Sequence, residues 1–269
     1  MAIITLTSDM GLKDFYVASI KASILTKCPD AVIVDITHQI AAFDIAQASF
    51  VLRNIYADFP PSTIHIISVN TEVDVEEKNP FLLVRHKNQY FISSNNGVFS
   101  LLFDELPDEI YSIENYDSAN DHSFPAKYIF ADVACKIANG IALESFGKPI
   151  QKINQRVILR PVVDKNLIRG SIMYIDGYGN LISNVTKQLF MDVCKDRSFT
   201  IYFSRGSYDI RMIHDNYNQV PEGEKVALFT SGGYLEIAIN KGVEGSGGGA
   251  SSLFGMKLND PFRIEFENE

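Results

Sequence analysis

The feature that most constrains the fold of this 269-residue chain is a change of hydrophobic pattern near its middle. Before Gly147-Lys148-Pro149, short β-branched runs alternate with longer segments whose apolar residues recur at helical spacing. After this point, short alternating runs follow one another, separated by Gly, Asn and Asp turns. The change predicts an α/β domain with a mostly parallel central sheet over 1–150, a linker near 147–162, and a smaller all-β domain over 163–269.

Local signals place the elements within this outline. Asp14 and Asp44 are expected to cap the helices after the first two strands, because a carboxylate accepts the free amides of a first turn. Pro29 should end the first helix, and Lys87-Asn88 should turn a hairpin. Strands are expected over 3–7, 31–36, 63–69, 81–85, 90–93, 170–175, 199–203, 226–229 and 234–240, and further helices over 98–106 and 129–143.

Composition disfavours several classes of function. The formal net charge is −9 and no dense run of Lys or Arg occurs, so no nucleic-acid partner is expected. Residues 1–7 lack a basic leader and are followed closely by Asp9, so neither a signal peptide nor a membrane segment is expected, and we predict a cytoplasmic protein. Cys28, Cys135 and Cys194 lie far apart and the histidines form no helix pair, which predicts neither disulfides nor a bound metal.

Asp9 is the first candidate ligand-binding residue. It follows the first predicted strand, and ligands in open α/β sheets bind outside the carboxyl ends of the strands. Its two carboxylate oxygens match the two hydroxyls of a ribose. An Asp in this place also commonly stabilises its own turn, and position alone favours that simpler interpretation.

A second candidate is the segment Asp176-Gly177-Tyr178-Gly179-Asn180. Its two glycines let a backbone approach a ligand closely, Tyr178 offers a flat ring, and Asn180 offers both donors and acceptors. The same composition is typical of a hairpin turn, which the spacing alone favours.

The glycine-rich segment 242–252 invites comparison with a phosphate-binding loop, because bare amides can hold an anion. It lacks the Lys-Ser or Lys-Thr end of such a loop and has no adequate helix after it. A surface loop is the preferred interpretation, so a nucleotide enzyme that uses these glycines is the least favoured hypothesis.

Taken together in this order and spacing, several short segments resemble the S-adenosylmethionine hydroxide adenosyltransferase and halogenase family. Its members use S-adenosylmethionine as an electrophile and displace methionine from the ribose 5′ carbon with water or halide. The resemblance spans nearly the whole chain. The segments that carry it are Ser8-Asp9-Met10-Gly11 with Asp14, Asp35-Ile36-Thr37-His38 with Phe43-Asp44, Asn95-Asn96-Gly97, the segment from Asp176 to Asn180, and the segment from Ser231 to Asn240.

The resemblance implies an α/β domain joined to a smaller β-barrel-like domain. It also implies a homotrimer in which each ligand site lies between one subunit's amino-terminal domain and a neighbour's carboxy-terminal domain. No cofactor is implied, because S-adenosylmethionine is itself the substrate or ligand. The residues assigned to it, all flat rings or short polar groups, are Asp9 for the ribose diol, Phe43 as an aromatic wall, Asp176 for the methionine amino group, Tyr178 and Tyr217 around the adenine, Asn180 for the base edge, and Ser231 for the methionine carboxylate.

The chain departs from the hydrolytic members of the family where they handle the attacking water. Those members use an Asp, an Arg and a His, and the corresponding positions here are Asn70, a residue near Glu77, and Pro125. Asn has no useful basicity and Pro has no side-chain donor or acceptor, so neither can take or orient a proton. The aromatic residue that halogenating relatives carry at the Asn70 position is also absent.

Two hypotheses for function remain open. The first is an enzyme that displaces methionine with water, giving adenosine and methionine, with an altered catalytic group that includes Asn70. The second is a catalytically inactive homologue that keeps the adenosyl pocket as a sensor or a degenerate enzyme. A substitute acid or base is offered by Glu72, Asp74, Glu77, Lys127 and Tyr128, which are otherwise solvated loop groups. The negative charge of the three acids among them favours a positive substrate and disfavours halide.

Overall fold

The chain divides into two compact units, Met1–Val157 and Ile158–Glu269. The division falls inside the segment that the sequence marks as a linker. The Asn154 amide donates to Asn95 Oδ1 at 2.9 Å, so the segment before the division is bound to the first unit. The computed structural model describes residues 2–72, 78, 80–114, 116, 123–157, 159–204, 208–243 and 248–267.

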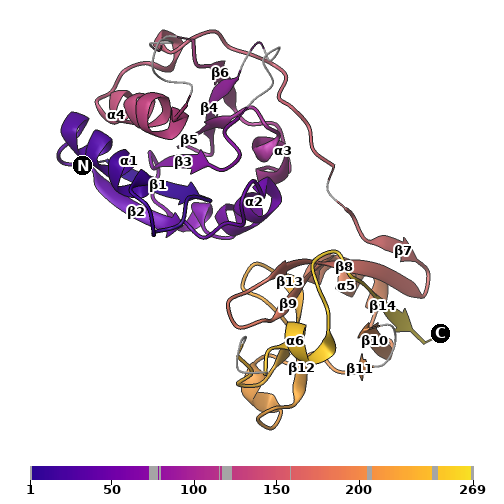
Figure 1. Cartoon of the computed structure of the whole chain (residues 1–269). Coiled ribbons are helices and arrows are strands. Elements are labelled where there is room, and N and C mark those ends of the chain that lie inside the picture. Colours follow the sequence, from indigo (N-terminus) through magenta and orange to yellow (C-terminus); the bar gives the residue numbers. More distant parts are fainter. Residues whose placement is uncertain are drawn as a thin grey trace. The chain divides into compact units, whose positions relative to one another are not determined.

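The first unit is built on a six-stranded sheet with the order β2-β1-β3-β5-β4-β6 (Figure 1). The pairs β1–β2, β1–β3 and β3–β5 are parallel, whereas β4 is antiparallel to both β5 and β6. The α/β domain with a mostly parallel sheet is therefore confirmed. The strands are β1 (Ile3–Ser8), β2 (Val32–Thr37), β3 (Ile64–Ser68), β4 (Phe81–His86), β5 (Gln89–Ser94) and β6 (Glu109–Ser112).

Helices cover both faces of this sheet (Figure 1). Helices α1 and α4 pack in the apolar cluster that contains Ile4 and Ile66, whereas α2 and α3 pack in the cluster that contains Ile67. Neighbouring strand residues point to opposite faces, so the two clusters lie on opposite sides of the sheet. The helical elements are α1 (Tyr16–Lys27), α2 (Ile45–Arg53), η1 (Tyr56–Asp58), α3 (Val98–Leu102), the π-helix η2 (Ala126–Phe130), α4 (Ala131–Ala138) and η3 (Leu143–Ser145).

One of the two predicted helix caps is confirmed and the other is wrong. The Asp44 carboxylate accepts the Gln47 amide at 2.9 Å and caps α2. Asp14 does not cap α1, because the helix begins later, at Tyr16, with Phe15 at the capping position and no side-chain cap. An exposed Asp in the loop before a helix is a weak indication of where the helix starts when residues distant in the sequence fix that loop.

Two predicted helix ends also need correction. The helix expected over 98–106 stops at Leu102, because Phe103 has an extended backbone with φ −112° and ψ 138°. The helix expected over 129–143 starts earlier, as the π-helix η2, and α4 ends at Ala138 before Gly140, which has φ 81°. Apolar periodicity continued beyond the point where backbone geometry ends each helix.

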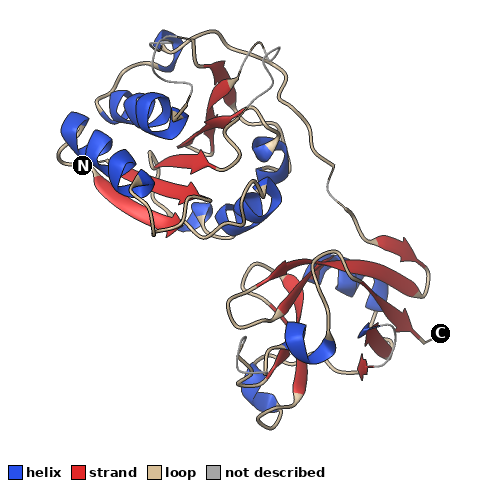
Figure 2. Ribbon diagram, in the orientation of Figure 1, coloured by secondary structure: helices blue, strands red, loops and turns tan. Residues whose placement is uncertain are grey.

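The second unit is a mainly antiparallel β domain (Figure 2). Its strands follow the order β11-β10-β14-β8-β9-β13-β12, and β7 pairs with β8 outside this path. The His214 amide, beyond β11, donates to Ala227 O of β12 at 2.8 Å, so the two ends of the sheet approach and nearly close a barrel. The strands are β7 (Val162–Asp164), β8 (Leu167–Ile175), β9 (Leu181–Thr186), β10 (Phe199–Phe203), β11 (Tyr208–Ile210), β12 (Lys225–Phe229), β13 (Tyr234–Ile239) and β14 (Pro261–Phe266).

This barrel-like domain is confirmed, but it also contains helices that the sequence pattern did not predict. Thr186 Oγ1 accepts the Leu189 amide at 3.2 Å and caps α5, which packs Phe190 and Cys194 into the core. The helical elements are α5 (Lys187–Cys194), η5 (Tyr217–Gln219) and α6 (Ala250–Phe254). None of the helices in the described ranges of either unit is both long and apolar enough to cross a bilayer.

Candidate functional site

The strand order of the first unit creates a topological switch point between β1 and β3. The chain leaves β1 toward β2 on one side and later returns to β3 on the other, with α1 and α2 on opposite faces. Ser8 pairs with Ser68 where these two strands end. Asp9 follows Ser8 directly and Asn70 lies two residues after Ser68, so the structure brings these two predicted residues to the same edge of the sheet.

The carboxylate of Asp9 is held by a segment distant in the sequence. Its Oδ2 accepts the Phe43 amide at 2.9 Å. Phe43 has a left-handed backbone, with φ 67°, and its side chain is 66% exposed. Among the described hydrogen bonds, Asp9 thus joins the loop before α2 and not an amide of its own turn. Its other carboxylate oxygen accepts no hydrogen bond from the residues that the structure describes.

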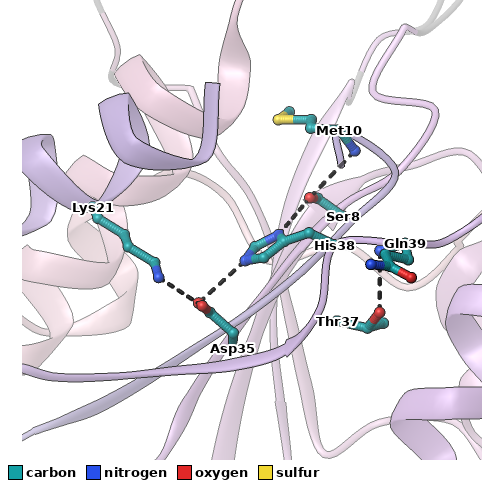
Figure 3. A network of polar contacts seen from close by, with 7 residues as sticks. All are labelled: Ser8, Met10, Lys21, Asp35, Thr37, His38 and Gln39. Carbon is teal, nitrogen blue, oxygen red and sulfur yellow. Dashed lines mark hydrogen bonds and ion pairs between the residues drawn. The ribbon is translucent and has the colours of Figure 1, made fainter. Parts of the chain in front are cut away.

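A chain of polar side chains runs from Lys21 and Asp35, which are partly exposed, to the buried His38 and Ser8, the residue before Asp9 (Figure 3). His38 Nδ1 is 2.7 Å from Ser8 Oγ, and His38 Nε2 is 3.1 Å from Asp35 Oδ1. Lys21 Nζ is 2.6 Å from Asp35 Oδ2. Burial alone would raise the pKa of Asp35, but hydrogen bonds from Lys21 and His38 outweigh it and hold that pKa below its ordinary value. Asp35 is therefore a carboxylate that accepts a hydrogen bond from Lys21 and lies against the His38 ring.

Asn70 itself is fixed through its backbone. It has φ 48°, and its carbonyl accepts Asn96 Nδ2 at 2.8 Å. The neighbouring Gly97 has φ 99°, and a Cβ there would lie 2.4 Å from Arg156 Cγ, so only glycine fits. The sequence analysis used Asn96 and Gly97 only as part of the family resemblance and predicted no contact with Asn70. Of the substitute acids, Glu72 is exposed, whereas Asp74 and Glu77 lie outside the described residues.

The same edge of the sheet also contains buried hydroxyl groups that have no hydrogen-bond partner among the described residues. Thr7 Oγ1 and Ser68 Oγ are buried at the ends of β1 and β3, and neither has a hydrogen-bond partner among the residues that the structure describes. Buried polar groups are normally paired, so unused donors at a switch point favour a bound ligand or water there.

Pro125, which the resemblance places at the position of the family's histidine, precedes the π-helix η2. Within that helix, Lys127 Nζ lies 3.4 Å from Tyr128 Oη and 4.7 Å from the centre of its ring. π-Helical turns occur frequently at functional sites. These two candidate substitutes thus contact each other at the surface.

In the second unit, the segment from Asp176 to Asn180 forms the turn between β8 and β9. Asp176 Oδ1 accepts the amides of Tyr178 and Asn180, both at 2.9 Å, and Oδ2 accepts Asn180 Nδ2 at 3.0 Å. The carboxylate thereby uses three of about four acceptor sites on its own turn. The hairpin interpretation is correct, and it leaves the Tyr178 ring 63% exposed.

Tyr217 contacts a buried acid that sequence reasoning missed. Its hydroxyl donates to Glu236 Oε1 at 2.8 Å, and Glu236 is only 3% exposed. Burial raises the pKa of Glu236 to about 7; the Tyr217 hydrogen bond opposes this rise and the Asp176 charge adds to it. Burial and the nearby Glu236 also raise the pKa of Tyr217. The signal for Glu236 was one carboxylate inside the otherwise apolar run of β13.

Ser231 is not part of this cluster. Tyr234 pairs with Thr186, and Ile237 pairs with Leu181 at the other end of β9. The Asp176 turn precedes one end of β9, and Ser231 lies beyond the other end. The length of β9, about 16 Å, therefore separates them.

The glycine-rich segment 242–252 lies partly outside the described residues. Its final part is not a free surface loop, because Ala250 is fully buried in α6 and the Ser251 amide donates to Gly179 O at 2.8 Å. This part therefore packs against the Asp176 turn. No group of three or more His, Cys, Asp or Glu side chains in the described ranges could hold a metal.

Fold and site together define a two-domain α/β-plus-β protein with a cluster of polar groups at its switch point and a tyrosine-lined acidic cluster in its β domain. Two family models match the chain: the SAM hydroxide adenosyltransferase N-terminal domain over residues 4–147 and the C-terminal domain over residues 170–263. The chain belongs to the SAM hydroxide adenosyltransferase family, which confirms the resemblance.

Relatives extend over nearly the whole chain. The (R)-S-adenosyl-L-methionine hydrolase of Thermus thermophilus is 24% identical over 272 residues, 96% of this chain and 97% of that protein. The hydrolase of the same name from Methanocaldococcus jannaschii is 28% identical over 193 residues, 69% of this chain and 67% of that protein. A fluorinase from an Actinoplanes species is 21% identical, covering 88% and 91%. The crystal structure of an uncharacterized conserved protein from Thermotoga maritima has 30% identity and a TM-score of 0.84, covering 97% and 99%.

Proposed function

We propose that this protein binds S-adenosylmethionine and transfers its adenosyl group to water, giving adenosine and methionine. The observation that carries the proposal is the match of both units to one family, with relatives of nearly equal length named as hydrolases. In this reaction a bond forms between a water oxygen and the ribose 5′ carbon while the bond from that carbon to sulfur breaks. The electron pair stays on sulfur, which becomes the neutral thioether of methionine, and the water loses a proton.

In the first unit, Asp9 would hold the ribose diol and Phe43 would form a wall beside it. The geometry that supports this is the switch-point position of Asp9, with one carboxylate oxygen fixed by Phe43 and the other available. A carboxylate that is already held loses little freedom when the ligand binds, which favours affinity.

In the second unit, Tyr178 and Tyr217 would enclose the adenine, Asn180 would read its edge, and Asp176 would meet the methionine amino group. The exposed rings and the acidic cluster support these roles, because flat rings favour a purine face and a negative field favours an ammonium and a sulfonium. A role for Ser231 at the methionine carboxylate rests on the resemblance alone. The same resemblance supports a homotrimer whose subunits share each site.

The catalytic group would be altered, with Asn70 and Pro125 in place of an acid and a histidine. Loss of a positioned general base commonly costs about 10² to 10⁴-fold in rate, whereas alignment and desolvation are retained. We therefore infer slow turnover, and the alternative is an inactive homologue that binds the same ligand.

The test is incubation of the purified protein with S-adenosylmethionine, with adenosine and methionine followed by chromatography. Calorimetry with adenosine, S-adenosylmethionine and ATP measures binding separately. Release of adenosine supports the enzyme, and binding of S-adenosylmethionine without product supports the inactive homologue. Tighter binding of ATP than of adenosine would overturn both.

A further inference from the structure

We propose that His38 is a positioning residue that clamps the turn from Ser8 to Gly11 and thereby sets the direction of the Asp9 carboxylate. This inference rests on the proposed function, because it assigns to His38 the orientation of the group that would hold the ribose.

The clamp consists of hydrogen bonds between two segments that are far apart in the sequence. His38 provides two of them: its ring Nδ1 contacts Ser8 Oγ, and its carbonyl accepts the Gly11 amide, both at 2.7 Å. These contacts hold both ends of the turn that contains Asp9. The Phe43 amide then holds the Asp9 carboxylate from the same segment.

The direction of each proton in the chain is fixed by Asp35. Because His38 Nε2 lies 3.1 Å from the Asp35 carboxylate, the proton of the neutral ring is favoured on Nε2 by that charge, although the pair lacks hydrogen-bond geometry, and Nδ1 is left to accept the Ser8 hydroxyl. Ser8 Oγ then has a lone pair for the Met10 amide, 3.4 Å away (Figure 3). The contact of His38 Nδ1 with Ser8 and that of the Met10 amide with Ser8 thus each have one donor and one acceptor, whereas His38 Nε2 meets Asp35 at ion-pair distance without hydrogen-bond geometry.

Burial of Ser8 and His38 makes their contact important for geometry and rules out a nucleophilic role for the serine. Ser8 is 1% exposed and His38 is 4% exposed, so no substrate carbon reaches Ser8 although it lies against a His and an Asp. Water cannot replace a lost partner at such a site without cost. Removing the contact between the His38 ring and Ser8 should therefore let the turn move, because water does not simply take the place of the lost partner.

Two substitutions of His38 separate its two ring contacts. In His38→Asn, the side-chain oxygen falls near the place of Nδ1 and can still accept the Ser8 hydroxyl, while the contact with Asp35 is lost. In His38→Gln, the longer amide reaches Asp35 and loses Ser8. If the clamp orients Asp9, adenosine affinity should fall about 10-fold in the Gln variant, which corresponds to the loss of one buried hydrogen bond. In the Asn variant, adenosine affinity should stay within about 2-fold of that of the original protein.

Amide hydrogen exchange of Gly11 and Phe43 in the ligand-free protein tests the clamp without any ligand. Both amides should exchange faster in His38→Gln and in Ser8→Ala, and remain slow in His38→Asn. Ser8→Ala removes the same contact by a small change, so it decides the question if the Gln variant does not fold. Lys21→Gln is the matched control, because it removes a partner of Asp35 away from the turn and should change neither exchange nor affinity.

Equal exchange and equal adenosine affinity in all four variants and the original protein would overturn the clamp. Faster exchange with the predicted pattern, in a protein that binds no adenosine at all, would instead support the clamp's geometry and overturn the ribose role together with the proposed function. The two failures are thus distinguished.

Discussion

The two units hold their candidate ligand-binding carboxylates in different ways. Asp9 is fixed by Phe43, 34 residues away, and its turn is clamped by His38, 30 residues from Ser8. Asp176 is fixed within its own hairpin, by amides two and four residues further on. The first arrangement exists only once the sheet is assembled, whereas the second forms together with one turn. Substitutions should therefore separate ligand binding from stability in the first unit and couple them in the second.

The largest effect is expected from pH, through the buried acid of the second unit. The pKa of Glu236 rises from an ordinary 4.5 to about 7, so between these values the folded protein binds more protons than the unfolded chain. Stability should therefore fall as pH increases through this window, by up to about 3 kcal/mol. Urea unfolding at several pH values, followed by a probe in the second unit, measures this. Glu236→Gln should remove most of the slope, and an unchanged slope would contradict the assignment.

Asp9→Ala should affect binding and leave folding nearly intact. The substitution removes the acceptor for the ribose hydroxyls, and two hydrogen bonds to a charged group are worth about 100-fold in affinity. Because Asp9 is only partly buried, we expect the melting temperature of the protein to change little. Calorimetry with adenosine and a thermal melt test the pair of expectations. A large fall in melting temperature with unchanged affinity would reverse our view of this residue.

Asp176→Ala should, by contrast, affect stability as well as binding and destabilise the second unit by about 2 kcal/mol, because three donors of the turn lose their acceptor. Denaturant unfolding of the full chain measures this effect. Asp176→Asn, which keeps one acceptor oxygen, is the matched control and should recover about half of the loss. If Asp176→Ala were as stable as the original protein, the turn would not depend on this carboxylate.

The smallest effect is expected for Tyr217→Phe. The ring that would face the adenine is kept, so adenosine affinity should change by less than about 3-fold. The hydrogen bond to Glu236 is lost, which should cost about 1 kcal/mol of stability at pH 8 and raise the pKa of Glu236 further. Calorimetry and the pH dependence of unfolding report the two quantities. An affinity loss above 10-fold would mean that the hydroxyl itself touches the ligand.

The same contrast between local and distant contacts explains which features the sequence predicts. The Asp44 cap and the Asp176 turn depend on partners within four residues, and both follow from spacing alone. The prediction for Asp14 was wrong because α1 begins at Tyr16, and the loop before it is bonded through Gly11 to His38, a contact that spacing does not reveal. The clamp on Asp9, the bond of Asn96 to Asn70, and the buried Glu236 beside Tyr217 all join elements that only the fold brings together.

The strand order of the first unit also has a consequence for the time at which each candidate site forms during synthesis. The edge that contains Asp9 needs β3, so about 60 residues must be added after Asp9, which at about 5–20 residues per second takes several seconds. The Asp176 hairpin needs only β9 and can close within microseconds of its emergence. During that interval β1 has an unpaired edge, and nascent chains should recruit chaperones most strongly before Ser68 has left the ribosome.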